Sequence, residues 1–333
     1  MQFRTEINLK KSDLQIEHQN TIITLGSCFA ENIAEHFKRY RFDVSANPFG
    51  VLYNPVSIYN AIRLLDEKKS FTKDDLFYDQ GEWHSFYHHS DFSHHDVNVC
   101  LKNINDGLVD TRKLLEQTDI VIITYGTSYV YEHIDKKNIV SNCHKISAKE
   151  FNRFRLSVEE VKQNISATLE LLKKINKNAR VIFTVSPVRH WKDGAVDNQL
   201  SKSILLLAVN DTIQENKNAV YFPSYEILMD DLRDYRFYES DLVHPNKLAT
   251  SYIWGKFTTA HLSDECEDVI GEIEPVIKAR LHRTRNKYSE SNIKFLNSQI
   301  ALCKRLMEKY SHLNLNDDVE YFQSELRDID SAK

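Results

Sequence analysis

The stretch "TIITLGSCFAENIAEHF", residues 21–37, decides the fold of the N-terminal part of the chain. It begins with four β-branched residues and a leucine, which is typical of a strand buried on both faces. After Gly26, large apolar residues recur at every fourth position: Phe29, Ile33 and Phe37. This spacing predicts a helix directly behind the strand. The chain therefore presents Ser27 and Cys28 at a strand-to-helix turn.

Further apolar runs of the same kind follow along the chain: "DIVIITY" (119–125), "ARVIFTVS" (179–186) and "AVYFP" (219–223). Each run is almost continuously apolar, as expected for parallel strands that helices cover on both sides. Helical patterns lie between them. One begins at Ser157, where "SVEE" has the form of a capping box, and another covers about 199–215. We therefore predict a three-layer α/β/α sandwich with a mainly parallel sheet.

The composition changes near residue 262. From Glu272 to Lys333 there is no glycine and one proline, and charged and aliphatic residues alternate at helical spacing, most clearly in "NIKFLNSQIALCKRLMEKY" (292–310). We predict a catalytic domain over residues 1–262 and a helical extension over 263–333. The extension is expected to pack on the α/β domain or on a second copy of the chain in a homo-oligomer.

Charge and cysteine content exclude several classes of protein. The net charge of −5 and the pI near 6.3 do not favour nucleic acid as a partner. Five scattered cysteines without a C-x-x-C pair predict neither a disulfide framework nor a structural zinc site. The start of the chain lacks the apolar core of a signal peptide, and no apolar run approaches about 18 residues. We expect a cytoplasmic protein that does not engage a membrane.

Polar residues follow each predicted strand, at the sheet edge where open parallel sheets bind ligands. They are Ser27 and Cys28, then Gly126, Thr127 and Ser128, then Arg189 and His190, and last the pair Asp241 and His244 in "DLVH". A serine at the start of a helix lies where backbone N–H groups stabilise negative charge, but it needs a base to take its proton. His244 is a candidate base, which Asp241 would orient.

Two alternatives use neighbouring residues. Cys28 is an alternative nucleophile, because a helix N-terminus lowers the pKa of a thiol. His190 is an alternative base, although the sequence shows no adjacent carboxylate at a useful spacing. The simplest other interpretation is that Ser27 only caps a helix and that "HPN" (244–246) is a surface turn.

The segment "GEWHSFYHHSDFSHHD" (81–96) contains five histidines. Imidazole and carboxylate groups suit zinc and similar ions, but the spacing does not favour a metal site. We expect this segment, His84 included, to line a substrate cleft, and we predict no metal and no cofactor.

The stretch "GSCFAENIA" (26–34) resembles the signature of the GSCFA family, which is related to the SGNH/GDSL hydrolases. Supporting stretches are "ANPFGVLYNP" (46–55), "ITYGTSYVYE" (123–132), "VSPVRHWKDG" (185–194), "NQLSK" (198–202) and "DLVHPN" (241–246). The resemblance implies an SGNH-type sandwich in which Ser27 is the nucleophile and Asp241 and His244 supply acid and base. It also implies that the N–H of Gly50 donates to an oxyanion hole, and we predict that Ser27, Gly126 and Ser128 complete this hole.

The chain departs from the related hydrolases in one motif. Their third motif reads G-x-N, and its asparagine donates to the oxyanion; here "GTS" (126–128) places Ser128 at that position. Ser128, Thr127 or Asn47 is expected to replace the amide, or two backbone donors suffice. Losing one such donor costs about 100- to 1,000-fold in rate.

The resemblance and the residues together predict a serine-dependent hydrolase that acts through an acyl-enzyme. The expected substrates are small acyl esters, acetyl esters of carbohydrates among them, with Asn47, Thr127, Arg189, His190 and His84 contacting the substrate. An O-acyltransferase with an acceptor other than water is one alternative. The other alternative is a non-catalytic carbohydrate-binding relative, which the absence of the G-x-N asparagine would explain.

Overall fold

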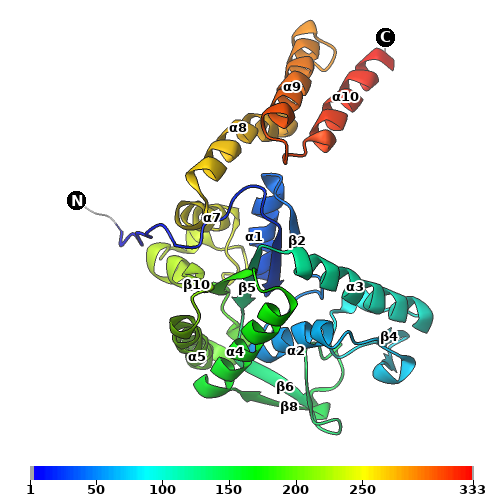
Figure 1. The fold of residues 1–333 in the computed structure, drawn as a ribbon, viewed down its shortest axis with the longest axis vertical. Coiled ribbons are helices and arrows are strands. Elements are labelled where there is room, and N and C mark those ends of the chain that lie inside the picture. The colour runs from blue at the N-terminus through cyan, green and yellow to red at the C-terminus, as the bar shows by residue number, and fades with distance from the viewer. Residues whose placement is uncertain (1–3, 332–333) are drawn as a thin grey trace.

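The computed structural model describes residues 4–331 and contains a central sheet of five parallel strands (Figure 1). They are β1 (Ile22–Gly26), β2 (Val44–Ala46), β5 (Ile120–Tyr125), β9 (Arg180–Val185) and β10 (Ala219–Phe222). Their order is β2-β1-β5-β9-β10. The winding direction reverses between β1 and β5, where Ile22 is in register with Ile120. Ligands bind at such a reversal, beyond the carboxyl ends of the strands.

Helices cover both faces of this sheet. Side chains that alternate along β5 point to opposite faces: Ile120 and Ile122 to one core, Val121 and Ile123 to the other. The first core is closed by α1 (Cys28–Arg39) and α7 (Lys247–His261). The second is closed by α2 (Pro55–Asp66), α3 (Val97–Gln117), α4 (Val158–Ile175) and α5 (Gly194–Glu215). The predicted three-layer sandwich is thus confirmed.

Local signals in the sequence explain where these helices begin. Ser157 and Glu160 form the predicted capping box at the start of α4. Asn246 caps α7, because its side chain accepts the N–H groups of Leu248 and Ala249. A short helix, α6 (Ser224–Glu226), follows β10 and continues into a π-helical turn.

Two small antiparallel sheets were not predicted from the sequence. One pairs β3 (Phe77–Asp79) with β4 (Glu82–His84). The other has the order β7-β6-β8 and consists of β6 (Tyr129–His133), β7 (Asn138–Val140) and β8 (Phe151–Arg155). These strands are short and only partly buried, so they lack the continuous apolar runs of the central sheet. The second sheet is inserted between β5 and α4, next to the carboxyl edge of the central sheet.

The predicted helical extension is confirmed. Helices α8 (Asp264–Leu281), α9 (Glu290–Lys309) and α10 (Asn316–Ser331) share a core of their own and project away from the sheet (Figure 1). Ionic contacts fasten them to the α/β part. The buried carboxylate of Asp318 binds Arg41, which follows α1, at 2.6 and 2.8 Å, and Glu274 of α8 lies 3.5 Å from Arg39 of α1. The division at residues 262 and 263 stays a prediction.

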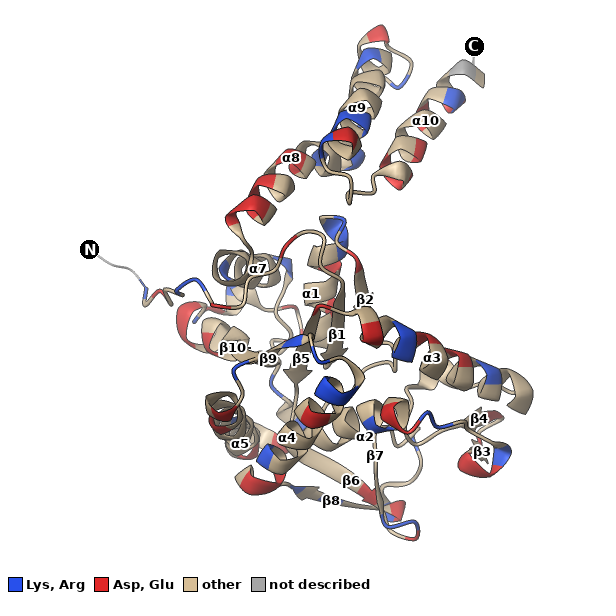
Figure 2. Cartoon of the chain, viewed as in Figure 1, with Lys and Arg blue, Asp and Glu red and all other residues tan. Residues whose placement is uncertain are grey.

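Acidic and basic residues are interspersed on α3, whereas α8 carries acidic residues in its first turn and basic residues in its last turn (Figure 2). Within residues 4–331, no helix is both long enough and apolar enough to span a bilayer.

Candidate active site

A pocket of about 620 Å³ opens at the carboxyl ends of β1, β5 and β9. It is lined by eight of the residues that the sequence singled out: Ser27, Cys28, Gly126, Thr127, Arg189, His190, Asp241 and His244. Segments more than 200 residues apart in the chain therefore meet at one edge of the sheet, as the parallel topology requires.

Ser27 occupies the turn between β1 and α1. Its side chain is only 2% exposed, and among the described residues its hydroxyl has no hydrogen-bond partner, although it stands at the N-cap of α1. Gly26 makes this turn possible: its φ is +133°, and a Cβ there would lie 2.1 Å from the carbonyl oxygen of Thr124. The turn thus leaves the Ser27 Oγ uncommitted at the pocket.

Asp241 and His244 form a hydrogen-bonded pair in the loop before α7. Oδ2 of Asp241 lies 2.6 Å from Nδ1 of His244, and Oδ1 accepts the backbone N–H groups of His244 and Val243. These two N–H groups, and then the imidazole, lower the pKa of Asp241 to about 2. An ionised carboxylate only accepts hydrogen bonds, so Nδ1 carries the proton and Nε2 of a neutral His244 is free to act as a base. No hydrogen bond joins this ring to Ser27.

His190 has a carboxylate partner as well, which corrects our expectation from the sequence. Its Nδ1 lies 3.0 Å from Oδ2 of Asp193, three residues further on. The side chain of Asp193 is buried and also binds Arg153 of the inserted sheet. This pair was not predicted because Asp193 follows its histidine, whereas Asp241 of "DLVH" precedes His244. Two His–Asp pairs therefore face one pocket.

The backbone N–H groups of the four predicted oxyanion residues, Ser27, Gly50, Gly126 and Ser128, all donate to acceptors within the protein. The N–H of Gly50 donates to the carbonyl oxygen of Asn47 at 2.7 Å, and Gly50 does not line the pocket; it forms a tight turn with φ +75° against His89. Ser128 is fully buried, and both its N–H and its hydroxyl bond to Oγ of Ser201. Neither residue is placed to donate to a bound oxyanion.

Three backbone N–H groups near the pocket are also engaged. The N–H of Ser27 donates to the carbonyl oxygen of Thr124 at 3.1 Å. Those of Gly126 and Thr127 both donate to the carbonyl oxygen of Tyr53, at 2.8 and 3.0 Å. The structure therefore gives Gly126 and Thr127 a role in holding the loop at Tyr53 against the end of β5.

Asn47 and His84 do not line this pocket. Asn47 accepts the N–H of Gly26 at 2.9 Å, which makes it a support for the Ser27 turn. Both ring nitrogens of His84 are bonded, to Ser93 and to the backbone of Asp79, so the predicted substrate contact is wrong for His84. From the same segment His89 lines the pocket instead. No cluster of potential metal ligands occurs within residues 4–331.

The alternative nucleophile Cys28 lines the pocket beside Ser27. Burial, and secondarily the carboxylate of Glu31, raises the pKa of this thiol above its usual value. A thiol whose pKa is raised is less often a thiolate at neutral pH, so the environment opposes a reactive Cys28.

Asn54 is a further pocket residue that was not predicted from the sequence. Its side chain is 6% exposed and lines the pocket. Its Oδ1 caps α2 by accepting the N–H of Ser57 at 2.9 Å. Because a backbone N–H must point at an oxygen, this bond fixes the amide orientation. The NH₂ group is left without an acceptor among the described residues. The signal in the sequence was "NP" (54–55) at a helix start. This pattern indicates a helix cap, but it does not show that the NH₂ group of Asn54 faces a pocket.

Lys202, in α5, was missed too. Its ammonium is fully buried and lies 2.7 Å from both the carbonyl oxygen of Gly126 and that of Ser186. It thus ties together the residues that directly follow β5 and β9. Burial lowers the pKa of Lys202 to about 7. A lysine in the otherwise apolar run of α5, within "NQLSK", was the available signal.

Comparisons with known proteins agree with this arrangement of motifs. The profile of the GSCFA family matches residues 21–257, and that of the GSCFA domain protein, C-terminal domain, matches residues 273–328. No curated protein matches the sequence.

Two solved structures match this chain at low similarity. A carbohydrate esterase family 3 protein from Talaromyces cellulolyticus is 10% identical with a TM-score of 0.34, over 78% of this chain and 99% of that one. An acetyl xylan esterase (Est2A) from the rumen bacterium Butyrivibrio proteoclasticus is 11% identical with a TM-score of 0.34, over 80% of this chain and 66% of that one. With both family profiles matched in order along the sequence, the chain belongs to the GSCFA family.

Proposed function

We propose that this protein is a serine esterase that cleaves small acyl esters through an acyl-enzyme at Ser27. One observation carries the proposal: an uncommitted, buried hydroxyl at a helix N-terminus shares a pocket with a carboxylate-oriented imidazole. Most buried hydroxyl groups have a partner, so an unpaired one at a pocket is a candidate for a functional role.

The reaction would follow the usual steps of acyl transfer. Nε2 of His244 takes the proton of Ser27 as Oγ attacks the acyl carbon, and the imidazolium then returns a proton to the departing alkoxide. Water, activated by the same imidazole, hydrolyses the acyl-enzyme. Asp241 holds Nδ1–H at 2.6 Å and stabilises the imidazolium. The half-exposed His244 ring must approach Ser27 to within hydrogen-bond distance, a contact that often tightens only when substrate binds.

We propose that Asn54 replaces the missing asparagine as an oxyanion donor. Its NH₂ group is uncommitted and lines the pocket with Ser27. Its neighbour Tyr53 accepts the N–H groups of Gly126 and Thr127, so Asn54 lies next to the loop that carries the motif in related hydrolases. The backbone N–H of Cys28, in the first turn of α1, is the second donor, because amides of a first turn have no partner inside the helix.

The proposal is tested with p-nitrophenyl acetate and with a fluorescent organophosphonate that labels active serines. The wild type should hydrolyse the ester and be labelled, whereas Ser27→Ala should do neither and His244→Gln should lose at least about 1,000-fold in kcat. Ser298→Ala and His282→Gln, exposed residues of the helical extension, serve as matched controls. Equal rates in wild type and Ser27→Ala would refute the proposal.

An acyltransferase differs only in the acceptor. A specific observation keeps it in consideration: the two His–Asp pairs leave one histidine free to activate an acceptor hydroxyl. Adding sugars to the acetate assay distinguishes the two reactions, because a transferase forms acetylated sugar faster than free acetate.

A further inference from the structure

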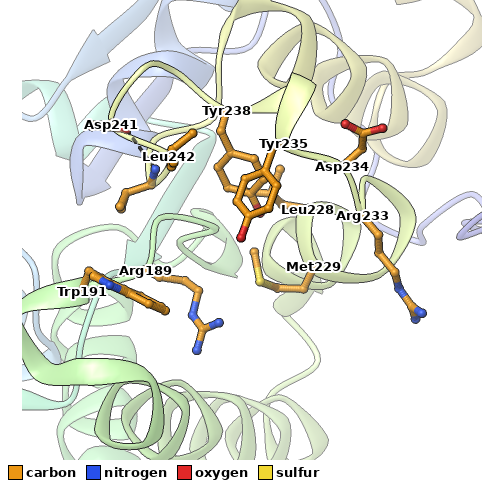
Figure 3. Close-up of a pocket in the computed structure, with 11 residues that line it drawn as sticks. Arg189, Trp191, Leu228, Met229, Arg233, Asp234, Tyr235, Tyr238, Asp241 and Leu242 are labelled. Atoms are coloured by element: carbon orange, nitrogen blue, oxygen red, sulfur yellow. Dashed lines mark hydrogen bonds between the residues drawn. The ribbon is translucent and has the colours of Figure 1, made fainter.

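A second pocket, of about 500 Å³, adjoins the candidate active site (Figure 3). Four residues line both pockets: Arg189, Trp191, Asp241 and Val243. The two pockets therefore meet at the loop that carries Asp241 and His244. A substrate larger than a simple ester would extend into it.

Exposed aromatic rings surround this second pocket. The Trp191 side chain is 55% exposed and that of Tyr235 is 74% exposed, and the Tyr238 ring lies 6.1 Å from the Tyr235 ring. Figure 3 shows Trp191 on one side of the pocket and the two tyrosines on the other. Flat apolar faces with polar edges suit the C–H faces of a pyranose ring, which also offers hydroxyl groups to the pocket rim.

Arg189 supplies a positive charge at the junction of the two pockets, where its guanidinium lies 5.3 Å from the centre of the Trp191 ring and Asp241 also lines both pockets. Arg189 forms no ion pair with any residue in the 4–331 range; one N–H donates to the carbonyl oxygen of Ala195, and Nε is unpartnered. The other arginine of this pocket, Arg233, is paired with Asp230 at 3.1 Å. A planar guanidinium with free N–H groups matches a carboxylate.

We propose that this second pocket is a subsite for an acidic sugar residue. The pyranose ring lies against Trp191 and Tyr235, and its carboxylate binds Arg189. The neighbouring sugar then carries its ester to Ser27. The placement of the ester at Ser27 rests on the proposed function, whereas the binding of the acidic sugar at Arg189 does not.

The test compares two disaccharides of the same linkage, one of galacturonate and one of galactose. Binding of both is measured by calorimetry to Ser27→Ala, which removes turnover. The acidic disaccharide should bind at least about tenfold more tightly, and adding Arg189→Gln should remove that preference, a loss of about 10- to 100-fold. Arg236→Gln, a nearby arginine that does not line the pocket, should keep the preference.

Trp191→Ala should weaken both disaccharides and leave their ratio unchanged, because the ring face does not distinguish charge. Equal affinity for the two disaccharides, or a preference that survives Arg189→Gln, would overturn the inference. A protein that hydrolyses p-nitrophenyl acetate but binds neither disaccharide would refute the subsite alone. One that binds the uronate and does not cleave esters would refute the proposed function alone.

Discussion

Replacing Lys202 by methionine should change how the stability of the protein depends on pH. The neutral amine has two N–H groups, and the carbonyl oxygens of Gly126 and Ser186 accept both at 2.7 Å. Burial lowers the pKa of Lys202 from 10.5 to about 7, so between these values the folded protein holds a neutral lysine and the unfolded chain a charged one. The unfolded chain then binds more protons, and stability rises with pH.

The magnitude follows from these two pKa values. Between the two pKa values, the free energy of unfolding rises by about 1.4 kcal/mol for each pH unit. From pH 7 to pH 9 the rise is about 2 kcal/mol, because at pH 7 the folded protein still holds part of the proton on Lys202. Methionine removes this gain. The methionine variant also leaves two carbonyl oxygens without a donor, which costs about 1–3 kcal/mol each. The wild type, in contrast, must deprotonate Lys202 on folding, and at pH 7 these two costs are roughly equal. The difference between the two proteins should therefore be small at pH 7 and favour the wild type by pH 9.

Urea unfolding at pH 7, 8 and 9, with thiols kept reduced, measures this difference. Titration of cysteines in the unfolded chain is common to both proteins and cancels when their free energies of unfolding are subtracted. Lys173→Met, an exposed lysine of α4, is the matched control and should run parallel to the wild type. If the wild type and Lys202→Met also run parallel from pH 7 to pH 9, the buried lysine is not neutral in the folded protein and the reasoning fails.

Four further predictions test the site and the packing. Asn54→Ala should lower kcat for p-nitrophenyl acetate by about 100- to 1,000-fold with little change in KM, whereas Ser128→Ala should leave kcat within about tenfold; the opposite order would return the oxyanion role to Ser128. Asp241→Asn should lower kcat by about 10⁴-fold, and a smaller effect than that of Asp193→Asn would make His190 the base. Gly26→Ala should yield little folded protein by circular dichroism, because its Cβ would overlap the Thr124 carbonyl. Arg41→Ala should destabilise the protein by about 1–3 kcal/mol in urea unfolding, because it removes two hydrogen bonds to the buried Asp318 carboxylate and leaves Arg280 as the remaining ionic partner.

Local sequence patterns predicted four of the five strands of the central sheet and the helices α1, α4 and α5. Continuous β-branched runs mark strands that are buried on both faces, and this holds for β1, β5, β9 and β10. The edge strand β2, of three half-buried residues, carries too little apolar character to be recognised. The strands of the β7-β6-β8 sheet are stabilised by pairing with one another, and no local pattern records that pairing.

The candidate site divides in the same way. The sequence by itself determined that Ser27 starts a helix after a glycine turn and that Asp241 precedes His244 by three residues, because these relations are set within a few residues of the chain. Only the tertiary structure decided which donors are free. It commits the N–H of Gly50 to Asn47 and the hydroxyl of Ser128 to Ser201. Among the described residues, it leaves the NH₂ group of Asn54 and the Nε of Arg189 without an acceptor. Whether a polar group is available depends on its partners, and these partners come from segments that are distant in sequence.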